Sequence, residues 1–254
     1  MLRVENVTKR FGGLTAVNGV SATFEAGSIT AILGPNGAGK TTLFAMIAGA
    51  VPPTSGRIVF AGRDLTGRRA DEVCRAGIAR TFQVVKPFWS LTVRDHIRAA
   101  RMYGAGDRPA ASLPARSGSS TGHEGKDRFR REAEADLLAL TGLTRRADEP
   151  ARNLTLADCR RLEIARALAT GARLILLDET MAGLTAEETR EAIAIVKGVR
   201  DSGRTVILIE HVLPAVTGLA ERALVLDRGA VIADGPPRDV LASAAVKKAY
   251  LGEE

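Results

Sequence analysis

The stretch GPNGAGKTT at residues 34–42 decides which fold this chain can adopt. It follows an apolar run at Ile29–Leu33 that predicts a strand, and it leads into a helical pattern at Lys40–Gly49. Glycines between a strand and a helix let backbone N–H groups converge on phosphate oxygens, and the helix directs the positive end of its dipole at them. In this setting the pattern G-x-x-x-x-G-K-[ST] predicts a P-loop that binds a nucleoside triphosphate.

The side chains of this loop have separate expected parts. Lys40 is expected to reach the β- and γ-phosphates, and the Thr41 hydroxyl is placed to ligate Mg²⁺. A chance Gly-rich turn is the alternative, and the strand before the loop and the helix after it argue against that. The expected nucleotide-binding residues are Gly34, Pro35, Asn36, Gly37, Ala38, Gly39, Lys40, Thr41 and Thr42.

An acidic pair follows a second apolar run, LILL at residues 174–177. The run shows no alternation, which is typical of a strand covered on both faces, and Asp178 and Glu179 come at its carboxyl end, where open α/β sheets bind ligands. Asp178 is expected to hold Mg²⁺, through water. Glu179 is expected to polarise the attacking water or accept its proton. A simple strand-end acidic pair is the alternative, which the P-loop upstream disfavours.

Two further polar side chains end predicted strands. His211 follows Thr205–Ile209, so we expect it at the same sheet edge as Lys40 and Asp178, where it could donate a hydrogen bond to the γ-phosphate. Gln83 ends the segment 78–82, and its neutral amide could orient water or ligate Mg²⁺. A structural histidine and an ordinary strand-end glutamine are the alternatives.

Strand-like and helical patterns alternate along the rest of the chain. Thr185 and Glu188 predict a capping box at a helix start, and Asp227-Arg228-Gly229 predicts a hairpin turn. The other predicted strands are Arg3–Val7, Val20–Phe24, Arg57–Phe60, Leu174–Asp178, Ala223–Leu226 and Val231–Ala233. The other predicted helices are Val93–Tyr103, Asp127–Thr141, Asp158–Thr170 and Ala186–Asp201.

Composition limits what else the chain can be. It has 254 residues, of which 45% are hydrophobic, which is enough for one large domain with a buried core. The net charge of +7 is spread among charges of both signs, and only 4% of residues are aromatic, so we expect no nucleic-acid partner. No apolar run approaches about 18 residues, and Cys74 and Cys159 lack disulfide or metal spacing, so a soluble cytosolic chain is expected.

One segment lacks large apolar side chains. Residues 104–125 are rich in Gly, Ala, Ser and Pro, so burial cannot offset the entropy lost on ordering them. We expect a flexible insertion there, between the half that carries the P-loop and the half that carries the acidic pair.

The order of these motifs resembles that of the ATP-binding subunits of ABC transporters, over essentially the whole chain. After the P-loop come Gln83, LTLADCRRLEIARAL at 154–168, LLDE at 176–179 and His211. Within that superfamily, several stretches resemble the branched-chain amino-acid transporter ATPases. The stretches that carry this likeness are GIARTFQ at 77–83, LTV at 91–93, RRLEIARAL at 160–168, AGL at 182–184 and AYLG at 249–252.

The resemblance implies a single ABC ATP-binding domain over residues 1–254. Its fold would be an α/β P-loop NTPase core with an antiparallel β subdomain and a helical subdomain inserted at about residues 84–160. It also implies an ATPase that uses ATP and Mg²⁺ to power import of a small solute, branched-chain amino acids above all, through separate membrane permease subunits. The chain would then lie peripherally at the cytoplasmic face of the inner membrane, with the loop from Gln83 to Trp89 near the permease.

Some implications stay open at this stage. The family pattern implies that Phe11 stacks on adenine, and a buried core phenylalanine is an equally open reading. The cargo could also be urea, a lipid or another solute, because it touches other subunits. A catalytically impaired regulatory or non-transport ABC protein is a further alternative, because part of the family pattern is altered.

The altered part is the segment that the resemblance assigns to a partner's ATP. Family members form a head-to-tail dimer in which each ATP lies between one chain's P-loop and the other chain's Leu-Ser-x-Gly-Gln signature. Here the aligned residues 154–158 read LTLAD, so Thr155, Ala157 and Asp158 would contact the partner's nucleotide. Thr180 also replaces the usual proline, and Thr185 the usual Asp or Asn.

These departures favour a heterodimer with a second, different ATP-binding subunit over a homodimer. Ala157 adds a methyl group and would be strained in any left-handed conformation that a glycine adopts there. Asp158 would bring a second negative charge toward a phosphate. A homodimer would carry both defects at both of its sites.

Overall fold

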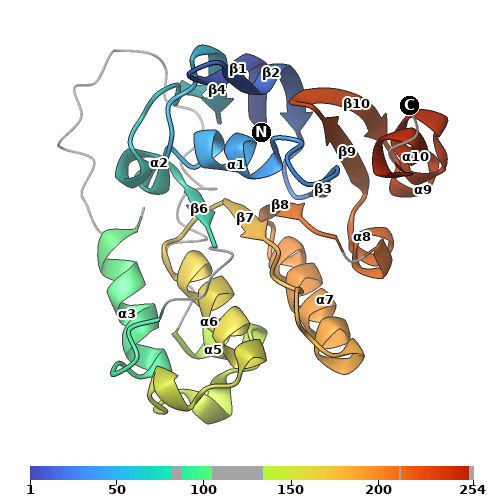
Figure 1. Ribbon diagram of the computed structural model, residues 1–254. Coiled ribbons are helices and arrows are strands. Elements are labelled where there is room, and N and C mark those ends of the chain that lie inside the picture. The colour runs from blue at the N-terminus through green and yellow to red at the C-terminus, as the bar shows by residue number, and fades with distance from the viewer. Residues whose placement is uncertain (82–86, 105–133, 212, 252–254) are drawn as a thin grey trace.

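The computed structural model describes residues 1–81, 87–104, 134–211 and 213–251, and they are built around a six-stranded sheet (Figure 1). The strand order is β10-β9-β3-β8-β7-β6. All neighbours are parallel except β9 and β10, which form the predicted hairpin. The strands are β3 (Ile29–Leu33), β6 (Ile78–Arg80), β7 (Leu174–Asp178), β8 (Thr205–Ile209), β9 (Arg222–Asp227) and β10 (Ala230–Gly235).

Strands β3, β7 and β8 are buried along their whole length, because both faces of the sheet are covered. Their side chains alternate between two hydrophobic cores. In β7, Ile175 and Leu177 belong to one core, and Leu174 and Leu176 belong to the other. The two cores clamp the strands from both sides, so the residues just beyond their carboxyl ends stand on a rigid base.

A second, antiparallel sheet covers one face, and Figure 1 shows α1 (Lys40–Ile47) between the two sheets. Its strand order is β2-β1-β4-β5. The apolar side chains of α1, Leu43 and Phe44 among them, join those of both sheets in one core. The strands are β1 (Leu2–Phe11), β2 (Leu14–Phe24), β4 (Ser55–Phe60) and β5 (Arg63–Asp64).

Helices cover the other face. The long helices α6 (Leu156–Ala169) and α7 (Ala186–Asp201) pack against the sheet, and α3 (Val93–Tyr103) and α5 (Glu134–Leu140) pack outside α6 (Figure 1). Between α5 and α6 lie two short 3₁₀ turns. Arginines of α3 tie this outer group together, since Arg94 bonds to Asp148 at 2.7 Å and Arg98 bonds to Glu134 at 2.9 Å.

The hairpin and the capping box are confirmed. Arg228 and Gly229, at the tip of the β9–β10 hairpin, have φ of 47° and 81°, as a tight two-residue turn requires. The Thr185 hydroxyl accepts a bond from Glu188 N–H at 3.2 Å, and the Glu188 carboxylate accepts one from Thr185 N–H at 2.8 Å.

Several boundaries differ from those predicted. Strands β1, β2, β4, β9 and β10 extend beyond the predicted runs at one or both ends, because backbone pairing continues past those runs. The first helix ends at Ile47 instead of Gly49. The helix predicted at Asp127–Thr141 is seen as Glu134–Leu140, and residues before 134 lie outside the described ranges, as does most of the segment 104–125.

Besides the two 3₁₀ turns, several short elements of the described chain were not predicted. Besides β5 they are α2 (Ala70–Ala76), α8 (Leu213–Leu219), α9 (Pro237–Ala242) and α10 (Ala244–Leu251). Each of these four helices spans about two turns, which is too short for a helical period to stand out in the sequence. Within the described ranges, none of the helices has the length and apolar character needed to cross a membrane.

Candidate active site

The P-loop lies where the sequence predicts it, between β3 and α1, and its glycines are required by close backbone contacts. Gly34 has φ 143°, and a Cβ there would lie 2.1 Å from the carbonyl oxygen of Leu226 in β9. Gly39 has φ 98°, and a Cβ there would lie 2.3 Å from the Ala16 oxygen in β2. Backbone of both sheets thus lies in close contact with the loop, and a side chain at Gly34 or Gly39 would displace the loop.

Lys40 is held inside the loop. Its side chain is buried, and Nζ donates hydrogen bonds to the carbonyl oxygens of Gly34 at 2.6 Å and Pro35 at 2.8 Å. Burial lowers the pKa of the ammonium group, while the charges of Glu179 and Asp178 act in the opposite direction. Lys40 is therefore a basic side chain held against the P-loop by two of the loop's carbonyl oxygens, as a phosphate site requires.

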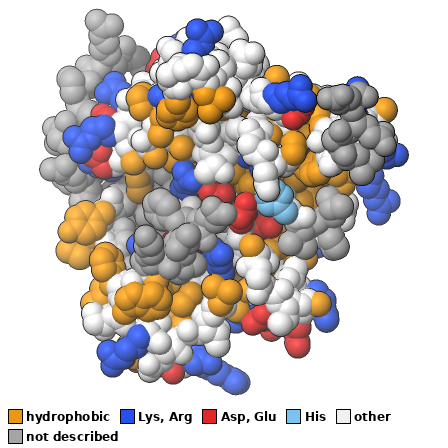
Figure 2. All heavy atoms as spheres, viewed as in Figure 1, with side chains coloured by type: hydrophobic (Ala, Val, Ile, Leu, Met, Phe, Trp, Pro, Cys, Tyr) orange, Lys and Arg blue, Asp and Glu red, His pale blue; other side chains and the backbone are white. Residues whose placement is uncertain are grey.

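Glu179 and His211 meet at the end of neighbouring strands. The His211 Nε2 lies 3.2 Å from a carboxylate oxygen of Glu179. Glu179 has φ 48°, a left-handed conformation that is costly for a non-glycine residue, and its N–H bonds to the Ile209 oxygen of β8 at 3.0 Å. Figure 2 shows acidic and histidine side chains meeting near the centre of this face. The fold thus holds Glu179 in a strained backbone conformation that directs its carboxylate.

These residues line one cleft of about 540 Å³. Phe11 stands at the cleft with 48% of its surface exposed, so it is no core residue, and the reading of a buried phenylalanine is wrong. Its stacking on adenine stays a prediction. The other lining residues include Asn36, Gly37, Ala38, Gly39, Lys40, Thr41, Thr42, Glu179, His211 and Arg228.

Asp178 is placed differently from the rest. Its carboxylate is buried and lies 2.7 Å from the guanidinium of Arg80, which comes from β6. Its backbone N–H donates to the Thr81 hydroxyl at 3.2 Å. In the described chain, the carboxylate that was expected to hold Mg²⁺ thus forms an ion pair with an arginine. The sequence analysis did not predict this contact.

The oxygen donors at this edge fit a magnesium ion. Thr41 lines the cleft, and the Asp178 carboxylate lies at the end of β7, which is separated from β3 by β8. Hydroxyl and carboxylate oxygens are hard ligands, and Mg²⁺ commonly takes only one or two of them beside substrate phosphates. Gln83, the third expected ligand, lies outside the described residues.

Two contacts to the site were missed by sequence reasoning. Glu210 follows β8 directly, is 2% exposed, and accepts bonds from Met181 N–H at 3.0 Å and the Thr180 hydroxyl at 3.3 Å. Burial raises its pKa to about 7. The Tyr250 hydroxyl of α10 accepts a bond from Gly34 N–H at 2.8 Å. Glu210 could have been found, because an acidic residue after an apolar strand is the signal that marked Asp178.

The model for the ABC transporter family matches residues 17–182, and the model for branched-chain amino acid ATP-binding cassette transporters matches residues 230–254. The chain belongs to the ABC transporter family. As a cassette of that family it is a nucleotide-binding ATPase, with the fold that the motif order implied.

Named relatives match this cassette over its full length. The high-affinity branched-chain amino acid transport ATP-binding protein LivG of Salmonella typhimurium is 36% identical, and the alignment covers all of this chain and 98% of that protein. BraF of Pseudomonas aeruginosa, with the same description, is 36% identical at the same coverage. The solved structure of an ABC transporter cassette in its ADP conformation is 31% identical, with a TM-score of 0.82 and coverage of 100% and 99%.

The altered signature of this cassette lies at the start of α6. Thr155 caps the helix, accepting a bond from Asp158 N–H at 3.1 Å, so the helix begins at Leu156 and not at Asp158. Ala157 therefore sits in the first helical turn and has no positive φ. The left-handed strain expected at Ala157 is absent from the chain as the structure describes it.

Asp158 is held within its own chain. Its carboxylate accepts a bond from the Thr155 hydroxyl at 3.0 Å and lies 3.3 Å from Arg146 and 3.6 Å from Arg161. Two guanidinium groups thus offset much of the negative charge that was expected to oppose a phosphate. The electrostatic argument against a homodimer is weaker than residue type alone suggests.

Proposed function

We propose that this cassette hydrolyses ATP to power import of branched-chain amino acids through separate membrane permease subunits. The full-length relatives carry the description of branched-chain amino acid transport ATP-binding proteins, which supports this cargo. The match of residues 230–254 to the branched-chain group supports it independently. The single observation that carries the hydrolytic part is the contact between Glu179 and His211 beside the P-loop.

The cleft supplies the groups that hydrolysis needs. Glu179 accepts the proton of the attacking water, and His211 donates a hydrogen bond to the γ-phosphate. Lys40 approaches the same phosphates from the loop side. Mg²⁺, held by Thr41 and Asp178, would neutralise charge on the phosphates. All of these side chains stand on the clamped carboxyl ends of β3, β7 and β8, or just beyond them.

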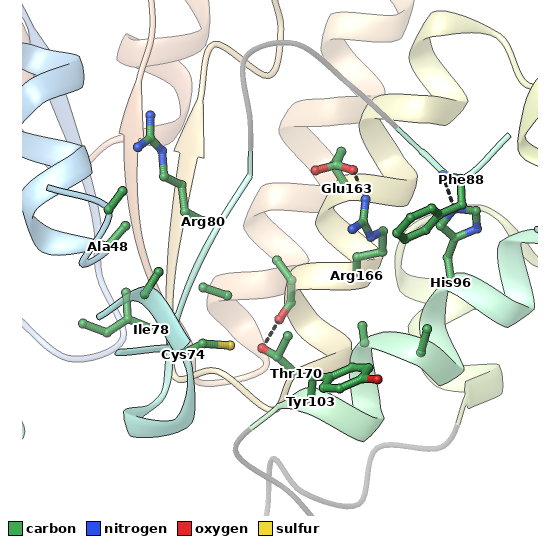
Figure 3. Close-up of a pocket in the computed structure, with 16 residues that line it drawn as sticks. Ala48, Cys74, Ile78, Arg80, Phe88, His96, Tyr103, Glu163, Arg166 and Thr170 are labelled. Atoms are coloured by element: carbon green, nitrogen blue, oxygen red, sulfur yellow. Dashed lines mark hydrogen bonds and ion pairs between the residues drawn. The ribbon is translucent and has the colours of Figure 1, made fainter. Parts of the chain in front are cut away.

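The permease subunits have a candidate docking surface. An apolar groove of about 420 Å³ lies between the central sheet and the outer helices, lined by Ala48, Cys74, Ile78, Phe88, Tyr103 and Ala167 among others (Figure 3). Phe88 is 61% exposed, its neighbour Trp89 56%, and Tyr103 79%. We assign this groove to a short apolar segment of a permease loop, and we propose on that basis that the chain works at the cytoplasmic face of the membrane.

A second, different ATP-binding subunit completes the proposal. This cassette keeps every P-loop residue but offers its partner the altered segment 154–158. A partner with an unaltered signature would complete the site on Lys40 and Glu179. The arginine contacts of Asp158 leave the homodimer as the competing assembly.

The test is reconstitution of the chain in liposomes with its permease subunits, alone and with the second cassette. We expect ATP-dependent uptake of labelled leucine that is lost with Glu179→Gln, and full activity only with both cassettes. Uptake of urea or another solute in place of leucine would overturn the cargo and leave the ATPase intact. Full activity with this cassette alone would overturn the heterodimer.

A further inference from the structure

Arg80 belongs to both the nucleotide side and the groove side of the sheet. Arg80 is the last residue of β6, and it lines the groove together with Ala79 and Ile78. Figure 3 shows its side chain pointing away from Cys74 and Thr170 in that groove. The guanidinium reaches Asp178 at 2.7 Å, at the end of the adjacent strand. One side chain therefore spans from the groove wall to the expected metal carboxylate.

The contact between Arg80 and Asp178 is well shielded from water. The Arg80 side chain is 14% exposed and that of Asp178 2%. The guanidinium carbon also lies 6.0 Å from the centre of the Phe44 ring in α1, the helix that opens with Lys40. A charge pair in such surroundings is screened little by salt and is costly to break by removing one partner.

We propose that Arg80 is the counter-ion that holds Asp178 in the metal-free cassette and that it competes with Mg²⁺ for this carboxylate. The inference rests on the proposed function in one respect, namely that Asp178 serves the metal. Because Arg80 also lines the groove, metal occupancy and groove occupancy are then linked. Linkage is reciprocal: an occupant of the groove that draws Arg80 from Asp178 tightens metal binding, and bound metal favours that occupant.

The first test counts bound metal directly. Mn²⁺ replaces Mg²⁺ and is measured by electron paramagnetic resonance on the whole chain saturated with ADP. Arg80→Gln keeps an amide donor for Asp178 but removes the competing charge, and we expect it to bind Mn²⁺ about tenfold more tightly. Arg80→Lys keeps the charge, so its affinity should stay within about threefold of the wild type. Unchanged or weaker binding by Arg80→Gln overturns the proposal.

Arg173→Gln is the matched control. Arg173 is a partly buried arginine whose guanidinium, like that of Arg80, lies over a phenylalanine ring, at 5.2 Å from the centre of Phe60, and it lines neither the cleft nor the groove. Its Mn²⁺ affinity should equal that of the wild type. If Arg80→Gln unfolds without metal, the stabilisation that Mn²⁺ gives it at fixed ADP should exceed the stabilisation that Mn²⁺ gives Arg173→Gln, and an equal or smaller stabilisation overturns the competition.

The second test reads the groove. Trp89 is the one tryptophan of the sequence and follows the groove residue Phe88, so its fluorescence reports on this surface. We expect Mg²⁺ to change Trp89 emission in the ADP-saturated wild type and in Arg173→Gln, but not in Arg80→Gln. A response that survives in Arg80→Gln, or is missing from the wild type, overturns the link to the groove.

Asp178→Asn separates this inference from the proposed function. If Asp178 serves the metal, the variant binds Mn²⁺ more weakly than the wild type. If Asp178→Asn binds Mn²⁺ as the wild type does, the proposed metal role of Asp178 fails. If only Asp178→Asn behaves as expected, the metal role stands and the competition by Arg80 fails.

Discussion

Two regions of this cassette carry family motifs, and the fold holds them in different ways. The strand-end cluster, formed by Lys40, Asp178, Glu179 and His211, stands on or just beyond the ends of strands β3, β7 and β8, which two cores clamp. The helix-start segment, residues 154–158, begins α6 and is held by bonds among its own neighbours. The first matches the family pattern residue by residue, and the second does not.

The difference shows where this fold tolerates change. Three members of the strand-end cluster, Lys40, Glu179 and His211, line one cleft, and the fourth, Asp178, is paired with Arg80, so a substitution there alters the cleft or its buried ion pair directly. In the helix-start segment Thr155 still caps the helix, and Arg146 and Arg161 accompany Asp158. Residue changes that look disabling in the sequence are thus accommodated by an ordinary capped helix.

The largest effect is expected for Glu179→Gln, in the strand-end cluster. Glutamine keeps the shape but cannot accept the proton of water, so we expect ATP hydrolysis to fall by about 10²-fold or more while nucleotide binding remains. Phosphate release and binding of a fluorescent nucleotide measure the two effects. Glu221→Gln, at an exposed carboxylate paired with Arg200, is the control and should hydrolyse ATP as the wild type does.

Glu210 sharpens the comparison through pH. Burial raises its pKa from 4.5 to about 7, so between these values the folded chain binds more protons than the unfolded chain. The stabilisation that Glu210 contributes is therefore fully present below pH 4.5 and is lost as pH rises through 7. This loss lowers the free energy of unfolding by about 3 kcal/mol. Glu210→Gln should lack this loss, because an amide keeps an acceptor for Met181 N–H without a charge.

Urea unfolding of wild type and Glu210→Gln at pH 5 and pH 8 measures the effect as a difference of differences, in which other titrating groups cancel. Glu188 is the control, because its pKa is lowered by bonds to Thr185 and the sign is opposite. Its stabilising part is present above pH 4.5 and is lost only below that value, so Glu188→Gln should lose about the same stability at pH 5 and at pH 8. Equal pH dependence in wild type and Glu210→Gln would contradict the burial argument.

Lys40→Ala tests the binding half of the strand-end cluster. Its loss removes one charge-assisted hydrogen bond to phosphate, of about 1.5–3 kcal/mol, which corresponds to about 10–100-fold weaker ATP binding. Lys247→Ala, on helix α10, is the control for loss of one positive charge. ATP affinity that is unchanged in Lys40→Ala would show that Lys40 does not bind the phosphates.

The core of the site was predictable because its signals are local. A glycine loop between strand and helix, and acidic or histidine residues after apolar strands, place Lys40, Glu179 and His211 at one edge before any coordinates exist. The structure brings them to one cleft. The adenine contact of Phe11 stays a prediction, although its exposure at the cleft suits it.

What could not be predicted depends on contacts between distant segments. The Arg80–Asp178 pair joins residues 98 positions apart, and the Tyr250–Gly34 bond joins residues 216 apart. The missed helices are stabilised by packing instead of by their own periodicity. Ala157 was misjudged because its strain depended on a backbone conformation that the cap at Thr155 replaces with a helix.

The smallest expected effect belongs to the helix-start segment. Restoring Ser, Gly and Gln at Thr155, Ala157 and Asp158 should raise ATP hydrolysis by this cassette alone, if a heterodimer is the working assembly. The gain is at most about tenfold, since it amounts to one hydrogen bond to a charged group of about 1.5 kcal/mol and no strain is relieved at Ala157.

The same triple variant should be less stable than the wild type, and that separates folding from catalysis. Glycine in the first turn of α6 costs about 1 kcal/mol, and glutamine leaves Arg146 and Arg161 without the carboxylate of Asp158. Thr155→Ser alone keeps the cap and is the control for both readouts. Turnover is measured over a range of protein concentration, because two chains must meet. A triple variant that hydrolyses ATP no faster, alone or with the second cassette, would show that the altered residues do not limit hydrolysis and would contradict the argument for a heterodimer.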